Sequence, residues 1–288
     1  MSIQYSAIIA SQARADGPAF SVRSIDVHAL GEQTSPVVVL DHFRVRGQPF
    51  APHPHAGFSA VTYVLRDSET GLRSRDSIGH DVVVGPGGVV WTQAGSGVIH
   101  EEVPADPGRE LHGVQIFVNT SAKNKFAAPQ VFELSRPHVP TWSNDTSDHL
   151  SVVVGAFRDT VSPLVPLEPF TLLDIELRHE IPVELQPDHY TLICTLTGRI
   201  GVRAERWSRQ VPSEQALALR GDGGRVVLTA TEVAHALLVS GPEIRESVVA
   251  QGSFIMNERS QIDDALARYR RGEMGRLAPL KQGRGPRS

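Results

Sequence analysis

The sequence predicts an all-β protein, built as an antiparallel sandwich or barrel. Many short segments are rich in β-branched residues, and glycine turns such as GPGG at 85–88 and GDGG at 221–224 separate them. Helical patterns do not alternate with these segments, so a parallel α/β sheet is not expected. The expected strands cover residues 37–40, 60–65, 81–84, 98–103, 111–118, 150–156, 171–177, 190–196, 226–229 and 234–239.

The composition limits the classes of partner. The chain has 288 residues, 40% of them apolar, which suffices for one large β domain or two ordinary ones. Its net charge of −4 provides no general attraction to nucleic acid or to an anionic membrane surface, so we expect no direct nucleic-acid binding. A protein partner stays open. No run approaches the roughly 18 consecutive apolar residues of a membrane helix, so no membrane association is expected.

The start of the chain and its cysteine content indicate the compartment. The opening MSIQYSAIIASQARADG lacks a basic segment followed by a long apolar stretch, so we expect no signal peptide. As the only cysteine, Cys194 cannot form an intrachain disulfide, which fits a reducing compartment. The predicted location is therefore the cytoplasm. Cys194 lies in an apolar run, which favours a buried, inert thiol over a reactive one.

One helix is expected after the last strand. Ser260 followed by Asp263 resembles a capping box, and Gly272 can end the helix. The apolar side chains that indicate packing on a sheet share one helical face: Ile262, Ala265, Leu266 and Tyr269. The basic, glycine-rich end at 281–288 is expected to fray.

Two short stretches carry the candidate chemistry, PHPHAGF at 52–58 and GVIHEEVP at 97–104. In an extended strand, residues i and i+2 project to the same side. His53 and His55 would then share one face, and so would His100 and Glu102. If the two stretches lie together inside one barrel, three imidazoles and one carboxylate converge. This ligand set suits a divalent first-row metal such as iron, manganese, nickel, copper or zinc.

Spacing alone leaves ordinary surface or core histidines open as the alternative. Histidine makes up 12 of the 288 residues, so a His-x-His pair arises readily by chance. Context favours a metal site, because each pair lies beside a strand-rich segment and a glycine turn in the same half of the chain. Glu101 should point away from Glu102 by strand alternation, so it is not counted as a ligand.

Several motifs connect the chain to a known family. They are DHF at 41–43, PHPHAGF at 52–58, TYVL at 62–65, RDSIG at 75–79, PGGVVWTQAGSGVIHEEVP at 86–104 and LHGVQIFVN at 111–119, followed near the end by GSFIMN at 252–257 and RYRRGEMG at 268–275. Through them the chain resembles the pirin family of the cupin superfamily. The resemblance spans most of the sequence and thins between about 130 and 250.

The resemblance implies a bicupin fold. Two stacked cupin barrels, each a double-stranded β-helix or jelly roll, would be followed by a C-terminal helix. The implied division is an N-terminal barrel at 1–126, a proline-rich connector at 127–148, a C-terminal barrel at 149–258, and the helix with a flexible tail at 259–288.

The resemblance also implies which residues hold a metal. The family's ligand pattern falls on His53, His55, His100 and Glu102, all in the first barrel. One divalent ion is expected, with Fe(II) preferred and Mn, Ni, Cu or Zn as alternatives. The second half has only separated histidines, which agrees with a metal-free second barrel: His179, His189 and His235.

An enzymatic activity follows from the same resemblance. Pirin-like proteins of this pattern are associated with quercetin 2,3-dioxygenase activity, in which O2 opens the ring of a flavonol and carbon monoxide is released. The expected partners are an aromatic small-molecule substrate and O2. Glu102, the only carboxylate in the implied ligand set, is the candidate base for the flavonol hydroxyl.

Two other functions stay open at this point. Some pirins are non-enzymatic, redox-sensitive regulators that bind a protein partner, and a metal-free binding protein is a third possibility. Many pirins have arginine after the second histidine and then GFET, whereas this chain has Ala56 and the run GFSA. The loss of that charge argues against partner binding.

Two further residues are candidates to support the site, and two histidines are expected outside it. His112 and Gln115 could orient a metal ligand, although a core or solvated role fits equally well. His42 and His80 lie in turn-like contexts and are expected at the surface.

Overall fold

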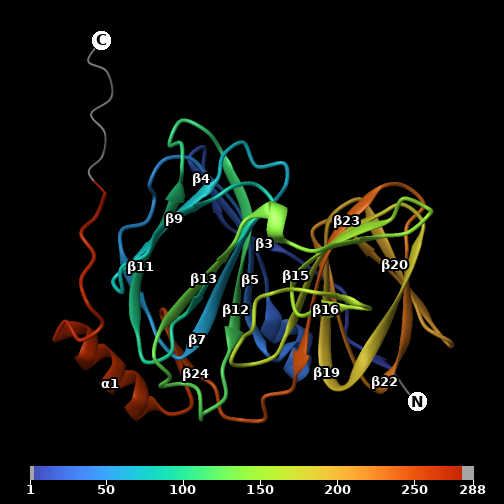
Figure 1. The fold of residues 1–288 in the computed structure, drawn as a ribbon. Coiled ribbons are helices and arrows are strands. Elements are labelled where there is room, and N and C mark those ends of the chain that lie inside the picture. Colours follow the sequence, from blue (N-terminus) through green and yellow to red (C-terminus); the bar gives the residue numbers. More distant parts are fainter. Residues whose placement is uncertain (1–2, 281–288) are drawn as a thin grey trace.

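The computed structural model describes residues 3–280, which form two barrels side by side (Figure 1). The helix α1 (Arg259–Arg270) lies against the first barrel, on the side away from the second. The segment 281–288, predicted to fray, lies outside the described residues. Two short 3-10 helices complete the helical elements of the described part of the chain: η1 (Val27–Thr34) and η2 (Arg136–His138).

The first barrel consists of a seven-stranded and a four-stranded antiparallel sheet. The strands of the larger sheet are β3 (Gln12–Asp16), β4 (Phe20–Ile25), β5 (Val37–Val45), β7 (Phe58–Val64), β10 (Val89–Gln93), β12 (Leu111–Asn119) and β13 (Gln130–Leu134). Those of the smaller sheet are β6 (His53–His55), β8 (Leu72–Asp76), β9 (Asp81–Val84) and β11 (Val98–Pro104). The larger sheet has the order β13-β10-β7-β12-β5-β4-β3, and the smaller has the order β6-β11-β8-β9.

The second barrel is one ten-stranded sheet. Its strands are β1 (Gln4–Tyr5), β2 (Ile9–Ala10), β14 (Thr141–Ser143), β15 (His149–Val154), β18 (Thr171–Leu177), β19 (Glu180–Thr197), β20 (Arg199–Arg203), β21 (Ser208–Pro212), β22 (Gln215–Thr229) and β23 (Ala234–Pro242). The order is β14-β15-β18-β23-β19-β22-β20-β21, with β1 and β2 both paired to β22. Two separate hairpins are β16 (Ala156–Phe157) with β17 (Thr160–Val161), and β24 (Val249–Gln251) with β25 (Phe254–Met256).

The strand β7 shows how the first barrel is joined to the second. All of its residues are buried, because one face lines the first barrel and the other packs on the second barrel. Thr62 donates a hydrogen bond to Glu102 within the first barrel. The next residue, Tyr63, points the other way and donates to Asp174 of β18 at 2.6 Å. Because side chains alternate with a period of two, a residue that faces the interior of the first barrel is followed directly by one that faces the seam between the two barrels.

The interior of the second barrel is filled by apolar side chains. They form one buried cluster that includes Ile175, Ile193, Leu217 and Leu228. His179 is exposed, and His235 bonds to Asp174 at the seam between the barrels.

The C-terminal segment returns to the first barrel. Ile262 and Ala265 of α1 are buried in a cluster with Ala56 and Ile99, which flank the histidines of the candidate site. The helix begins two residues earlier than the sequence predicts. Its capping box is formed by Glu258 and Gln261 rather than Ser260 and Asp263, since Gln261 accepts from the backbone N–H of Glu258 at 3.1 Å.

The all-β prediction with one C-terminal helix is confirmed, with two differences in detail. Residues 221–224, predicted as a turn, lie within β22, where positive φ angles at Gly223 and Gly224 bend the strand without ending it. The predicted connector 127–148 contains β13 and β14, each paired to a different barrel. The proposed domain boundaries stay a prediction.

Two smaller predictions also have a structural counterpart. Cys194 is buried, and burial together with the charge of Glu214 raises the pKa of its thiol to about 12, so it is inert at neutral pH. Within residues 3–280, the helices are too short and too polar to cross a membrane.

The seam predicts a pH-dependent stability. Burial raises the pKa of Asp174, but its bond to His235, the charge of His235, and contacts with Tyr63 and Arg66 outweigh burial and lower it below 3.8. Burial lowers the pKa of His235, but Asp174 outweighs this effect and raises it above 6.5. The pair therefore stabilises the fold fully between pH 3.8 and 6.5. Its contribution falls on either side of this window.

Urea unfolding of the wild type and of Asp174→Asn, measured from pH 4 to 9, tests this expectation. The difference between their unfolding free energies should be largest below pH 6.5 and shrink as the pH rises through the pKa of folded His235. A difference that is constant across this range would show that the seam pair does not titrate as described.

Candidate metal centre

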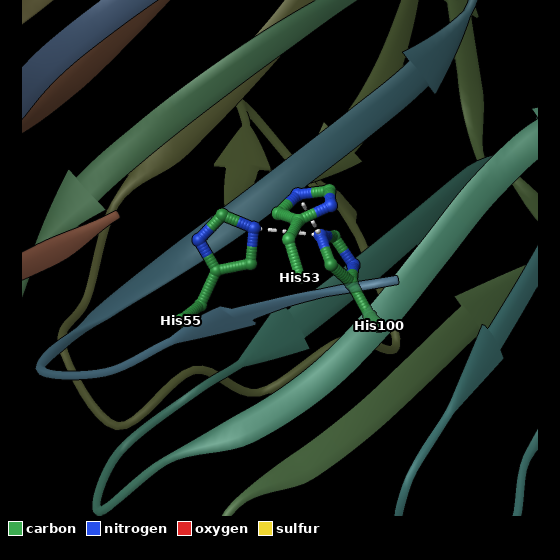
Figure 2. Close-up of side chains that lie close together, drawn as sticks. All are labelled: His53, His55 and His100. Atoms are coloured by element: carbon green, nitrogen blue, oxygen red, sulfur yellow. Dashed lines mark hydrogen bonds between the residues drawn. The ribbon is translucent and has the colours of Figure 1, made fainter. Parts of the chain in front are cut away.

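The pairing of β6 with β11 brings three histidines together. His53 lies opposite His100 in this antiparallel pair, and Val98 lies opposite His55. Directly paired residues share a face of the sheet, and so do residues i and i+2 of one strand. All three imidazoles consequently project to the same side and converge, as Figure 2 shows.

The ligand atoms of the triad are close to one another. The Nε2 atoms of His55 and His100 are 2.6 Å apart, and those of His100 and His53 are 3.2 Å apart. Within the described part of the chain, this is the group of three or more candidate ligands whose atoms all lie within 4.8 Å. A divalent metal ion accepts nitrogen ligands in such a cluster.

Burial keeps two of the three imidazoles in the neutral form that binds metals. Desolvation, followed by the charges of His100 and His53, lowers the pKa of His55 well below 6.5. Desolvation, followed by the charge of His53, lowers the pKa of His100 to about 3. Neutral rings direct Nε2 lone pairs at one another, an arrangement that a cation between them stabilises. The three histidines therefore fit a bound metal.

Packing holds the rings in place. The ring of His55 makes edge contacts with Phe58 and Phe117, with centroids 5.1 and 5.5 Å away. The Nδ1 atoms of His55 and His100 are buried without a hydrogen-bond partner, so apolar contacts orient these two rings. For His53, the carbonyl oxygen of Ala51 lies 3.0 Å from Nδ1.

The turn after His55 is tied to the C-terminal hairpin. Gly57 has φ +82°, and a Cβ there would lie 2.0 Å from the carbonyl oxygen of Ile255, so glycine is required. The ammonium of Lys125, whose side chain is fully buried, donates to the Gly57 oxygen at 2.7 Å, to the Ile255 oxygen at 3.0 Å and to Asn119. Burial lowers the pKa of Lys125 to about 8. This clamp fixes the backbone two residues beyond a candidate ligand.

Glu102 lies in the same cavity as the triad but outside the group of close ligand atoms. Thr62 donates to its Oε2 atom at 2.8 Å, and Gln115 donates to the same atom at 3.3 Å. Burial raises the pKa of Glu102 to about 7, although the bond from Thr62 opposes the shift. Its role as a fourth ligand stays a prediction.

Glu101 occupies the opposite side of β11. Its carboxylate accepts from Arg75 at 2.9 Å and from Gln48, and the residue is fully buried. Strand alternation thus separates the two neighbouring glutamates as the sequence predicts.

A cavity of about 150 Å³ opens onto the site. Its polar lining comes from His53, His100, Glu102, Gln115 and Asp41. Its apolar lining is larger and includes Phe20, Val22, Phe43, Val45, Phe50, Leu72 and Leu111. Phe50 is 44% exposed and meets Phe20 edge-on, with ring centroids 4.7 Å apart, at the rim.

Of the other residues singled out from the sequence, one lies beside the site and three lie away from it. Gln115 reaches Glu102 and can orient it, whereas His112 faces His42 and Asp67, away from the triad. The side chain of His80 is 42% exposed, as expected for a surface residue. The prediction that His42 lies at the surface is wrong, since its side chain is 15% exposed and packs at the seam.

Sequence reasoning missed three residues of the site. Thr62 lies on β7 and Asp41 on β5, the two strands that flank β12, and Lys125 lies in the loop after β12. Burial raises the pKa of Asp41, against the effect of the hydrogen bond from Ser24. A polar residue inside an apolar strand is a signal that could have found Thr62 and Asp41. Lys125 has no local signal, because its partners are distant in the sequence.

Comparisons with known proteins agree with this architecture. The family model described as Pirin matches residues 12–118, and the model described as Pirin C-terminal cupin domain matches residues 172–275. The first model falls on the first barrel, and the second covers strands β18 to β23 of the second barrel together with the C-terminal hairpin and α1. The two matches confirm the predicted bicupin fold. A Pseudomonas aeruginosa protein named "Putative quercetin 2,3-dioxygenase PA3240" is 31% identical over 256 residues, covering 84% of this chain and 87% of that protein.

Solved structures share the fold. A quercetin 2,3-dioxygenase from Acinetobacter baumannii aligns with a TM-score of 0.84 at 23% identity, over 96% of this chain and 99% of that one. The pirin YhhW from Escherichia coli, solved in complex with nickel(II), aligns with a TM-score of 0.64 at 19% identity, over 84% of this chain and 100% of that one.

Removing two imidazoles should abolish the candidate metal centre. The double variant His55→Ala, His100→Ala is expected to bind one divalent ion per chain fewer than the wild type, because one remaining imidazole cannot hold the ion. Elemental analysis after equilibrium dialysis measures this difference. The matched control is the exposed His138→Ala, which should bind as much metal as the wild type. Equal metal content in the double variant would contradict the assignment.

The Lys125 clamp should contribute strongly to stability. Lys125→Met leaves buried acceptors without a donor, so we expect a loss of about 2–4 kcal/mol in unfolding free energy. Guanidinium unfolding measures it, with the exposed Lys123→Met as control. If both variants unfold at the same denaturant concentration, the clamp has no such role.

Proposed function

The chain belongs to the pirin family, and we propose that it is a metal-dependent dioxygenase that opens the ring of a flavonol-type substrate with O2. The observation that carries the proposal is the composition of the cavity. Candidate metal ligands lie in its polar lining, and the rest of its wall is apolar and partly aromatic. Such a cavity suits an aromatic substrate with an ionisable hydroxyl. The relative named for this activity supports the same reading.

We assign the metal to His53, His55, His100 and Glu102, with Fe(II) as the preferred ion. When bound, a divalent ion would supply Lewis acidity for the substrate hydroxyl and a shared site for substrate and O2. The protein's own part is to hold three imidazoles together beside a largely apolar cavity. Two buried rings and the clamp behind Gly57 supply that rigidity.

Glu102 is the proposed base for the substrate hydroxyl. Both Thr62 and Gln115 donate to Oε2, so neither of them holds Oε1. These two hydrogen bonds hold Oε2 in place. Oε1 can then accept the proton of the substrate hydroxyl. Glu102 lines the cavity together with His53 and His100.

The size of the cavity limits how a substrate sits. An apolar cavity of about 150 Å³ holds roughly one benzene ring, and this cavity has the same volume. A three-ring flavonol would place its hydroxyl-bearing ring inside and leave the others at the rim. Phe20 and Phe50 offer aromatic surface there.

The regulator hypothesis finds less support. Ala56, which stands where many pirins carry arginine, is fully buried against Phe254. This position therefore has neither the charge nor the exposure that a partner would recognise. We retain partner binding as the reading that would follow if the metal-loaded protein has no dioxygenase activity.

Glu102→Gln should lower the rate of flavonol consumption. Loss of a general base costs about 100-fold or more in kcat, measured as decay of quercetin absorbance and release of carbon monoxide under air. Rates must be compared at equal metal content, because the residue is also a proposed ligand. The exposed Glu133→Gln is the control. A wild-type rate no faster than that of metal in buffer would defeat the dioxygenase proposal, and an unchanged rate in Glu102→Gln would defeat the role of the base.

A further inference from the structure

We propose that His42 and His112 form a second metal-binding site, at the seam between the two barrels, for a divalent ion that prefers imidazole, such as Zn²⁺, Cu²⁺ or Ni²⁺. The site lies apart from the triad and does not depend on the dioxygenase proposal. It combines residues of the first barrel with a carboxylate of the second.

The sheet brings the two histidines together. β12 pairs with β5, with His112 opposite Arg44 and His42 opposite Val114. The two histidines are thus diagonal neighbours on one face of the sheet, within reach of long side chains. Their Nε2 atoms are 2.6 Å apart, the same separation as between His55 and His100 in the triad.

Carboxylates fix which nitrogen of each ring carries the proton. The Nδ1 atom of His42 lies 3.1 Å from Oε1 of Glu214, and that of His112 lies 2.7 Å from Oδ1 of Asp67. Ionised carboxylates only accept hydrogen bonds, so each Nδ1 is the donor. In neutral rings, both Nε2 atoms then present lone pairs to the same point. Two lone pairs at this separation require a cation or a shared proton between them.

The surroundings favour a metal ion over a proton. A carboxylate that orients the far nitrogen of an imidazole is the usual arrangement behind metal-bound histidine, where it fixes the tautomer and strengthens the ligand. Arg23 holds the other oxygen of Glu214 at 2.9 Å, which keeps that carboxylate in position. Imidazole is a preferred ligand of zinc, copper and nickel.

There is also room for the rest of a coordination shell. A cavity of about 200 Å³ is lined by both histidines together with Asp67, Thr197, Glu214 and His235. The two imidazoles supply the protein ligands, and water fills the remaining positions. The side chains of His42 and His112 are 15% and 6% exposed, so the ion would be largely enclosed.

Such an ion would couple the two barrels. Glu214 precedes β22 of the second barrel, while His42 and His112 belong to the first. An ion that fixes His42 also strengthens its bond to Glu214, so binding should stabilise the packing between the barrels.

The test counts zinc ions on the tag-free full chain. After equilibrium dialysis against Zn²⁺, elemental analysis should find two ions in the wild type, one in His42→Gln, and one in His55→Gln, His100→Gln. The exposed His138→Gln should keep two. One ion in the wild type, or two in His42→Gln, would overturn the proposal.

A second measurement stays informative if a seam variant fails to fold. In His55→Gln, His100→Gln, which retains both seam histidines, bound Cu²⁺ should give an electron paramagnetic resonance signal with coupling to imidazole nitrogens. The same variant should unfold at a higher temperature with Zn²⁺ than without it. Absence of nitrogen coupling, or of the thermal shift, would contradict a seam site. The triad assignment would be untouched by that result.

Discussion

The pairing of β6 with β11 extends over three residues, and the arrangement of the metal centre depends on its register. With His53 opposite His100, all three imidazoles lie on the inner face of the sheet. A slip of one residue would turn the histidines of β6 outward, because side chains alternate with a period of two. β11 is fixed along its other edge by five residue pairs with β8, so the register is set by the sheet and transmitted to the short strand.

The surrounding structure maintains this short contact. The C-terminal hairpin and α1 cover the outer side of β6, where Ala56 and Ile99 pack with Phe254 and Met256. Lys125 binds the carbonyl oxygens of Gly57 and Ile255, and so joins the turn after β6 to the hairpin. The second barrel buries the outer face of β7, whose inner face carries Thr62 and thereby holds Glu102. Burial of His55 and His100 by this packing keeps their imidazoles neutral, as metal binding requires.

Much of this arrangement follows from local sequence pattern. The spacing of His53 with His55, and of His100 with Glu102, predicts a shared face because strand periodicity is a local property. The contacts that local pattern misses are long-range. The clamp at Lys125 joins segments that are 68 and 130 residues away in the sequence. The contact between His42 and His112 joins residues that are 70 positions apart. The turn predicted at 221–224 fails for a related reason, since pairing with β19 continues the strand through its glycines.

The central claim is that a metal ion sits where the three Nε2 atoms meet. Anomalous diffraction at the iron edge, from crystals of protein loaded with Fe(II), tests it directly. The account predicts a peak about 2.0–2.2 Å from the Nε2 atoms of His53, His55 and His100, with a carboxylate oxygen of Glu102 as a further ligand. The account would be contradicted by triad histidines bonded only to one another, with the iron peak elsewhere or missing.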